Sequence, residues 1–387
     1  MKRDYRLPIH SSPSSKMSAK VVAASNTSIH ASFATLPPEL LLAIIPQITY
    51  SPDSILSLLL TSRALHSLIK SHEYSLTRSI ASRQIPVHQP ENYFPSLDQL
   101  TTFANLSTYH TRIETLSNLV ENYPASLSSA ASNNKSQQCP SCSSTTTSFL
   151  LQPRWSTLHK TGLLLLYRLQ DTRSYCHKVA LLNGLPAISL ACILFALLAQ
   201  NRILRASGTL ETLPRIEGKR WWESSSGGGG GGGGDVEGNE EANARRKRAV
   251  EMRETEMVCE ELALAEGVGF YGDLWDGEEE DDGGDGDGNG KERKESWARR
   301  ALQSELFSLP SLQTAFYPCC GAPRPPTLTS CLRRAFAAKC YCQFSEVERK
   351  VWEVLSNTVL DDVDEDLMGR IVRGEDAVGK GGTRRVF

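Results

Sequence analysis

The sequence predicts an all-α protein. Apolar residues recur at helical spacing in several segments, whereas runs of Val, Ile and Tyr that alternate with polar residues are nearly absent. Segments rich in Ser, Gly or acidic residues separate these apolar blocks and are typical of disorder. We therefore expect an N-terminal three-helix unit followed by a helical domain with long disordered insertions.

Composition limits the class of protein. A chain of 387 residues is long enough for two or three domains. Its net charge of -2 argues against a protein built mainly to neutralise phosphates, so we expect no nucleic-acid partner. Ten cysteines lie in the chain without a regular framework, which indicates reduced thiols and a cytoplasmic and/or nuclear location.

The first helical block begins at Leu36. Apolar residues every four positions, from Leu36 to Ile48, line one face of a first helix, which we expect Pro46 to kink or end. Ser51-Pro52-Asp53 is a typical start for a second helix. A third stripe follows, comprising Leu65, Leu68, Ile69, His72, Leu76 and Ile80.

Composition and helix signals also predict the later boundaries. We expect a helix over Ser96–Tyr123 that starts with a Ser96/Gln99 capping box and breaks at Pro124, and a second capping box at Ser345/Glu348. The first half of the chain is predicted to contain a disordered tail over 1–30, the three-helix unit over 31–85, and the first part of the helical domain over 86–223 with a loop at 125–148. After it we expect a Gly-rich linker over 224–240, a helix over 241–270 and an acidic linker over 271–295. The second part of the domain is predicted over 296–370, followed by a disordered tail over 371–387.

Residues 31–85 resemble an F-box, the docking domain of many ubiquitin-ligase adaptors. The resemblance lies in Leu36-Pro37-x-Glu39-Leu40, in Thr61-Ser62-Arg63, and in the leucine spacing between and after them. The rest of the chain is similar to uncharacterised fungal F-box-like proteins. Pro46 and the absence of a tryptophan near the end of the motif depart from the usual pattern.

The resemblance implies a function as well as a fold. It implies three helices that bind a Skp-type adaptor, which in turn bridges to a cullin scaffold, while the C-terminal helices recruit an unknown protein target for ubiquitination. The chain itself would then be non-catalytic. The residues implied in partner binding are Leu36, Pro37, Glu39, Leu40, Ile44, Ile45, Leu56, Leu59, Arg63, Leu65 and Leu68.

Physical chemistry favours the same interpretation. A short helical unit with more leucine and isoleucine than it can bury needs a partner surface. Burial of one leucine side chain contributes roughly 1.5–3 kcal/mol, so a few anchors suffice for a specific interface. Alternatives are a helical scaffold without a ubiquitin role, and a membrane-anchored protein that spans at 179–199. We expect a buried helix there and not a membrane span, because Asn183, Gly184 and Pro186 interrupt that stretch.

Other motifs favour ordinary interpretations. Cys139-x-x-Cys142 lacks two further zinc ligands at matched spacing. The calcium-loop pattern from Asp285 has Ser296 where a bidentate Glu is needed, and Arg245–Arg248 is typical of a solvated helical face. No catalytic motif is present, so we expect no catalytic, metal or cofactor site. Aromatic residues that can anchor a target or fill a core are Trp155, Tyr167, Trp221, Trp222 and Trp352.

Overall fold

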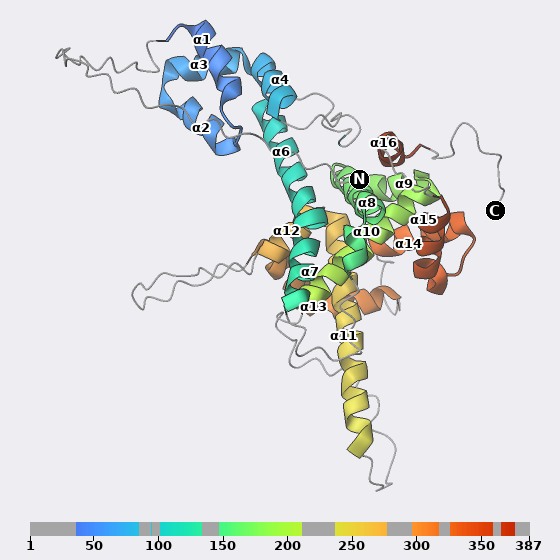
Figure 1. The fold of residues 1–387 in the computed structure, drawn as a ribbon. Helices are drawn as coiled ribbons and strands as arrows, with labels where there is room; N and C mark the ends of the chain where they lie inside the picture. Colours follow the sequence, from blue (N-terminus) through green and yellow to red (C-terminus); the bar gives the residue numbers. More distant parts are fainter. Residues whose placement is uncertain are drawn as a thin grey trace, which may run out of the picture.

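The computed structural model describes residues 36–84, 94, 101–133, 147–210, 237–276, 296–316, 326–358 and 365–375. Over these residues the chain is mostly helical and contains no strand, which confirms the predicted all-α class. Figure 1 shows a small N-terminal bundle that lies apart from a larger helical domain, with one long helix running between them.

The N-terminal bundle contains four helices where the sequence predicted three. Helix α1 spans Pro38–Ile44, a 3-10 turn spans Ile45–Gln47, and α2 spans Pro52–Thr61. The predicted effect of Pro46 is confirmed, because α1 ends at Ile44. The third predicted stripe is split at His72 into α3 (Arg63–Ser71) and α4 (Glu73–Gln84), which corrects the count.

Side-chain caps explain where the bundle's helices start. The Ser51 hydroxyl accepts a hydrogen bond from the Ser54 amide at 3.0 Å, and the Ser62 hydroxyl accepts one from the Leu65 amide at 3.2 Å. Each bond satisfies an N–H group that has no partner within its own helix. The Thr61-Ser62-Arg63 sequence is therefore a break with a cap, since Ser62 has extended backbone between α2 and α3.

The bundle has a hydrophobic core of its own. Its buried residues are Leu41, Ile45, Tyr50, Ile55, Leu65, Ile69, Leu76, Ile80, Phe103 and Leu106. The Gln84 side chain closes the turn after α1: its Nε2 donates to the carbonyls of Pro46 and Ile48, and its Oε1 accepts from the Tyr50 amide. Because Phe103 and Leu106 belong to the next helix, the core extends beyond the predicted boundary at residue 85.

The long helix connects the bundle to the larger domain. Helix α6 spans Phe103–Ser117, a π-helical turn spans Asn118–Asn122, and α7 spans Tyr123–Asn133. The predicted break at Pro124 is wrong: the chain remains helical to Asn133, so the first part of the predicted loop at 125–148 is helix. Proline is tolerated in the first turn of a helix, and the wider π turn immediately precedes it.

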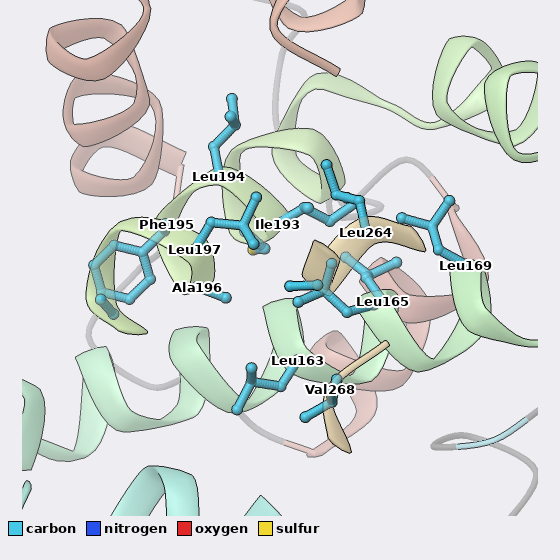
Figure 2. Packing of buried hydrophobic residues seen from close by; sticks show 14 of the residues in the cluster. Leu163, Leu165, Leu169, Ile193, Leu194, Phe195, Ala196, Leu197, Leu264 and Val268 are labelled. Atoms are coloured by element: carbon cyan, nitrogen blue, oxygen red, sulfur yellow. The ribbon is translucent and has the colours of Figure 1, made fainter. Parts of the chain in front are cut away.

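Helices α8 and α10 form the centre of the larger domain. Helix α8 spans Pro153–Gln170 after a short 3-10 turn at Ser148–Leu151, α9 spans Tyr175–Gly184, and α10 spans Ala187–Ser207. Leucines of α8 and apolar residues of α10 pack together with Leu264 from a later helix (Figure 2). The main core of the protein therefore comes from the most apolar block of the sequence.

Helix α10 contains the one stretch in the described residues that is long and apolar enough to cross a membrane. The helix has 21 residues, and 83% of its most apolar stretch is buried inside the protein. The helix begins eight residues later than the predicted span at 179–199, because α9 ends at Gly184 and Pro186 is the N-cap of α10. Neighbouring helices α8, α14 (Leu328–Cys340) and α15 (Val347–Thr358) cover it.

Three helices follow the glycine-rich segment. Helix α11 spans Glu237–Glu266, α12 spans Gly269–Asp276 and α13 spans Trp297–Phe316. The predicted acidic linker began at residue 271, but residues 271–276 are helical, with Tyr271 and Leu274 buried in the main core. The apolar residues at these positions explain why the order extends further than the charge pattern indicated.

The C-terminal helices complete the domain. Helix α14 spans Leu328–Cys340, α15 spans Val347–Thr358 and α16 spans Glu365–Arg373. The predicted Ser345/Glu348 capping box is wrong, because the box is made by Gln343 and Glu346 ahead of a short 3-10 turn. The predicted tail over 371–387 is also corrected at its start, since Ile371 and Val372 of α16 are buried in the main core.

Several predicted features lie outside the described residues. These are the tail over 1–30, the Ser96/Gln99 box, the Cys139-x-x-Cys142 motif, the glycine run, Trp221 and Trp222, the calcium-loop pattern and the end of the chain. The Arg245–Arg248 patch lies on α11, but its side chains are not described.

Candidate functional site

Exposed leucines on the N-terminal bundle form the strongest candidate site. Leu40 on α1 is 50% exposed, and Leu56 and Leu60 on α2 are 53% and 76% exposed. We call these three residues the leucine surface. Contiguous exposed apolar side chains mark binding surfaces, whereas single ones are normal. Leu56 and Leu60, four residues apart on α2, are neighbours on one helix face.

Helix α2 exposes leucines because its apolar residues cover a wider face than the one that packs on the bundle core. Ile55 is buried in the bundle core, and Leu58 and Leu59 are half-buried against it. Leu56 and Leu60 are four residues apart and share the opposite side, which faces solvent. The apolar surface that does not pack on the bundle core is exposed to water unless a partner covers it.

The structure divides the predicted partner-binding residues into three groups. Pro37, Glu39, Leu40, Leu56 and Arg63 are exposed. The half-buried ones are Leu36, Ile44, Leu59 and Leu68, of which Leu36, Leu59 and Leu68 pack against the bundle core. Ile45 and Leu65 are 0% and 6% exposed, so in this conformation they contribute to the core of the bundle and not to its surface.

The sequence interpretation missed Leu60, the most exposed leucine of the bundle. A signal for it was present, because Leu58, Leu59 and Leu60 are consecutive and cannot all face one side of a helix.

Charged groups accompany the leucine surface. Glu39 precedes Leu40 in the first turn of α1, and Arg63 opens α3 directly after the end of α2.

The bundle is attached to the larger domain through α6. The Glu73 carboxylate accepts a hydrogen bond from the Phe103 amide at 2.8 Å, which ties α4 to the start of α6. Further along α6, Arg112 forms two hydrogen bonds with the Asp171 carboxylate, at 3.0 and 2.5 Å, and its guanidinium lies over the rings of Phe94 and Tyr167. Planar, bidentate pairs of this kind fix orientation as well as distance.

The larger domain contains buried polar groups, which are also candidates for chemistry. Glu260 of α11 accepts hydrogen bonds from Asn201 of α10 at 3.0 Å and from Arg333 of α14 at 3.0 Å. Burial raises the pKa of the Glu260 carboxyl above its ordinary value, although Arg333 acts in the opposite direction. Glu261 accepts from the amides of Leu328 and Thr329, so it caps the start of α14. These contacts join three helices and are typical of a structural network.

His159 is a second buried group. It is fully buried on α8, where its Nε2 lies 2.9 Å from Nε2 of Gln200 on α10. Burial lowers the pKa of His159 to about 3, so the ring is neutral in the folded protein at physiological pH. Its position in the core among α8 and α10 side chains indicates a packing role.

Acidification should therefore destabilise the protein through His159. In the unfolded chain the imidazole titrates near 6.5, whereas in the fold it stays neutral to about 3. Between these values the unfolded state binds the extra proton, so the free energy of unfolding falls as pH decreases below 6.5. The expected contribution is about 1.4 kcal/mol per pH unit, or about 2 kcal/mol between pH 6.5 and 5.

Urea denaturation at pH 7.5 and pH 5 measures this effect in the wild type and in a His159→Gln variant. The variant should lose less stability on acidification than the wild type, by roughly the 2 kcal/mol above. His177, which is exposed, provides the matched control: His177→Gln should leave the acid sensitivity unchanged. Equal acid sensitivity of the wild type and His159→Gln would show that His159 is not buried as described.

Among the described residues, no group of three or more His, Cys, Asp or Glu side chains is placed to hold a metal ion. Comparison of the chain with known protein families, with curated proteins and with solved structures finds no match.

Proposed function

We propose that this protein is a non-catalytic F-box adaptor of a cullin-type ubiquitin ligase. In this proposal the N-terminal bundle binds a Skp-type adaptor, and the larger helical domain recruits a protein target. The exposure of Leu40, Leu56 and Leu60 on a bundle that has its own core is the observation that supports it most strongly.

The arrangement of the bundle is consistent with docking. Its core residues come from all four helices and from the start of α6, so the bundle does not need the leucine surface for its own stability. Covering these three leucines with a partner would remove apolar surface from water at roughly 25 cal/mol per Å². The exposed side chains are thus available for binding without unfolding the unit that presents them.

Co-purification of the full-length chain with a Skp-type adaptor tests the proposal. The double variant Leu40→Asp/Leu56→Asp should bind the adaptor at least about tenfold more weakly. In the complex the adaptor would cover both leucines, and charges at these positions would lose their hydration on binding. Leu59 is unsuitable as a test residue, since it packs against the bundle core and Asp there would disturb folding.

Ser57→Asp is the matched control. Ser57 is exposed on α2 beside Leu56, so the substitution adds one of the two negative charges of the double variant without removing an apolar anchor. It should bind the adaptor within a few-fold of the wild type, and both variants should keep the helical circular-dichroism signal. If the well-folded wild-type chain does not bind the Skp-type adaptor at all, the proposed function is wrong, and a helical scaffold without a ubiquitin role is the better interpretation.

A further inference from the structure

A cluster of aromatic rings reaches the surface of the larger domain. Phe149 of the 3-10 turn, Trp155 of α8, Phe195 of α10 and Trp352 of α15 lie with neighbouring ring centroids 5.2–6.5 Å apart. Phe195 is fully buried and anchors the cluster, whereas the other three are half-buried. We call Phe149, Trp155, Trp352 and the arginine described next the aromatic–arginine patch.

Arg202 lies over two of these rings. Its guanidinium carbon is 5.6 Å from the centroid of Phe149 and 5.2 Å from that of Trp352. The side chain is half-buried, and among the described residues no carboxylate lies within 4.0 Å of it. Burial and the nearby Arg205 lower the pKa of Arg202, whereas the Glu348 carboxylate, which lies beyond ion-pair distance, acts in the opposite direction.

Arg154 adds a second cation to the same cluster. Its guanidinium carbon lies 5.4 Å from the Trp155 ring, and its Nη2 donates to the carbonyls of Leu355 and Ser356 at the end of α15. Both hydrogen bonds are made to carbonyl groups and not to a carboxylate, so they do not neutralise the positive charge of Arg154. Leu151, 42% exposed, provides an apolar side chain two residues after Phe149.

We propose that the aromatic–arginine patch binds an acidic segment of a partner protein. Half-buried tryptophans and arginines are the side chains that most often dominate the energy of protein interfaces. An arginine that is already oriented by stacking loses little freedom when a carboxylate binds to it. Two cations that form no ion pair with a carboxylate of the described residues favour an anionic ligand, and Leu151 with the exposed ring surface favours apolar residues beside the acidic ones.

This inference is independent of the proposed docking of the N-terminal bundle. The patch belongs to the larger domain, and the leucine surface belongs to the bundle, which has a separate core. Binding of a Skp-type adaptor and binding of an acidic segment can therefore be measured one at a time, and failure of one does not imply failure of the other.

Fluorescence anisotropy with the full-length chain tests the proposal. The probe is a fluorescein-labelled peptide in which Glu alternates with Gly and Leu, and the matched peptide has Gln at every Glu position. The wild type should prefer the Glu peptide by at least about tenfold, and this preference should shrink as salt is raised. If the wild type does not distinguish the two peptides, the proposal is overturned without reference to any variant.

Substitutions then locate the binding. Arg202→Gln should abolish most of the preference for the Glu peptide, and Arg202→Lys, which keeps the charge but not the planar stacking group, should have an intermediate effect. Arg334→Gln removes an exposed arginine on α14 and is the control that should bind as the wild type does. Equal losses in Arg334→Gln and Arg202→Gln would mean that net charge alone attracts the peptide, which overturns the assigned site.

The chain's own acidic residues Glu278–Asp282 are the competing occupant. A variant with these five residues replaced by Ser tests them in the same assay. Binding of the Glu peptide only by this variant would assign the patch to that segment and overturn the proposed partner. Unchanged affinity in the variant supports the proposal.

Discussion

Replacing Arg333 by Met should lower the free energy of unfolding by about 3–5 kcal/mol at neutral pH, because it leaves a buried carboxylate without its cation. The Glu260 side chain is 4% exposed and that of Arg333 is 15% exposed. Water therefore cannot solvate the Glu260 carboxylate in place of the lost guanidinium. The remaining hydrogen bond from Asn201 is not enough to hold a charge in the core.

The loss should depend on pH in a defined direction. The pKa of Glu260 is already above its ordinary value of 4.5 in the fold, and removal of Arg333 should raise it further. A carboxyl with a raised pKa binds its proton more tightly in the folded state than in the unfolded state. Relative to the wild type, the penalty in Arg333→Met should therefore increase as pH rises above the pKa that Glu260 has in the fold with Arg333 present, and should be smaller at pH 5 than at pH 7.5.

Urea denaturation at these two pH values measures the effect. Arg334→Met, on the exposed neighbour, should change stability by less than about 0.5 kcal/mol. Adding Glu260→Gln to Arg333→Met should recover part of the loss, because it removes the uncompensated charge but keeps an acceptor for Asn201. A loss of the same size in Arg334→Met, or none in Arg333→Met, would contradict the buried ion pair.

Replacing Gly162 by Ala should also destabilise the protein strongly. An added Cβ would lie 2.1 Å from the Cys192 carbonyl oxygen and 2.6 Å from the Ala196 Cβ, so α8 and α10 would have to separate. Overpacking of this kind typically costs about 1–3 kcal/mol, and here it must exceed the gain of about 1 kcal/mol in helix propensity. Gly162→Val should cost more than Gly162→Ala.

Thermal and urea denaturation of the full-length chain compare these variants with Gly184→Ala. Gly184 is the last residue of α9, and nothing lies within 4 Å of a Cβ added there. Alanine at this position should leave stability unchanged or raise it by up to about 1 kcal/mol. If Gly162→Ala is as stable as Gly184→Ala, then α8 and α10 do not pack as closely as the structure describes.

The local pattern of the sequence was enough for several features of the fold. Apolar spacing predicted the helical class, Pro46 ended α1, Ser51 capped α2, and Pro186 preceded α10. These features depend on interactions within one or two turns of chain, which is why a single sequence reveals them. Of the candidate site, the sequence also identified Leu40 and Leu56 as residues of interest.

Features that depend on distant contacts were not predictable in the same way. The π turn that carries the helix through Pro124, and the burial of Ile371 and Val372 after the predicted end of the domain, require neighbours that are remote in sequence. The same applies to the choice between Ile45, which faces the core, and Leu40, which faces solvent. Periodicity identifies the apolar side chains, but it does not say which of them another helix will cover.

The sequence by itself thus determined that the chain is helical, that an N-terminal unit carries an excess of leucine, and where several helices begin. Only the tertiary structure decided which leucines remain exposed, that α10 is enclosed by α8, α14 and α15, and that Arg202 lies over two aromatic rings. The physical reason is that apolar spacing and the signals that start and stop a helix lie within a few consecutive residues, whereas exposure and pairing are set by contacts between segments far apart in the chain.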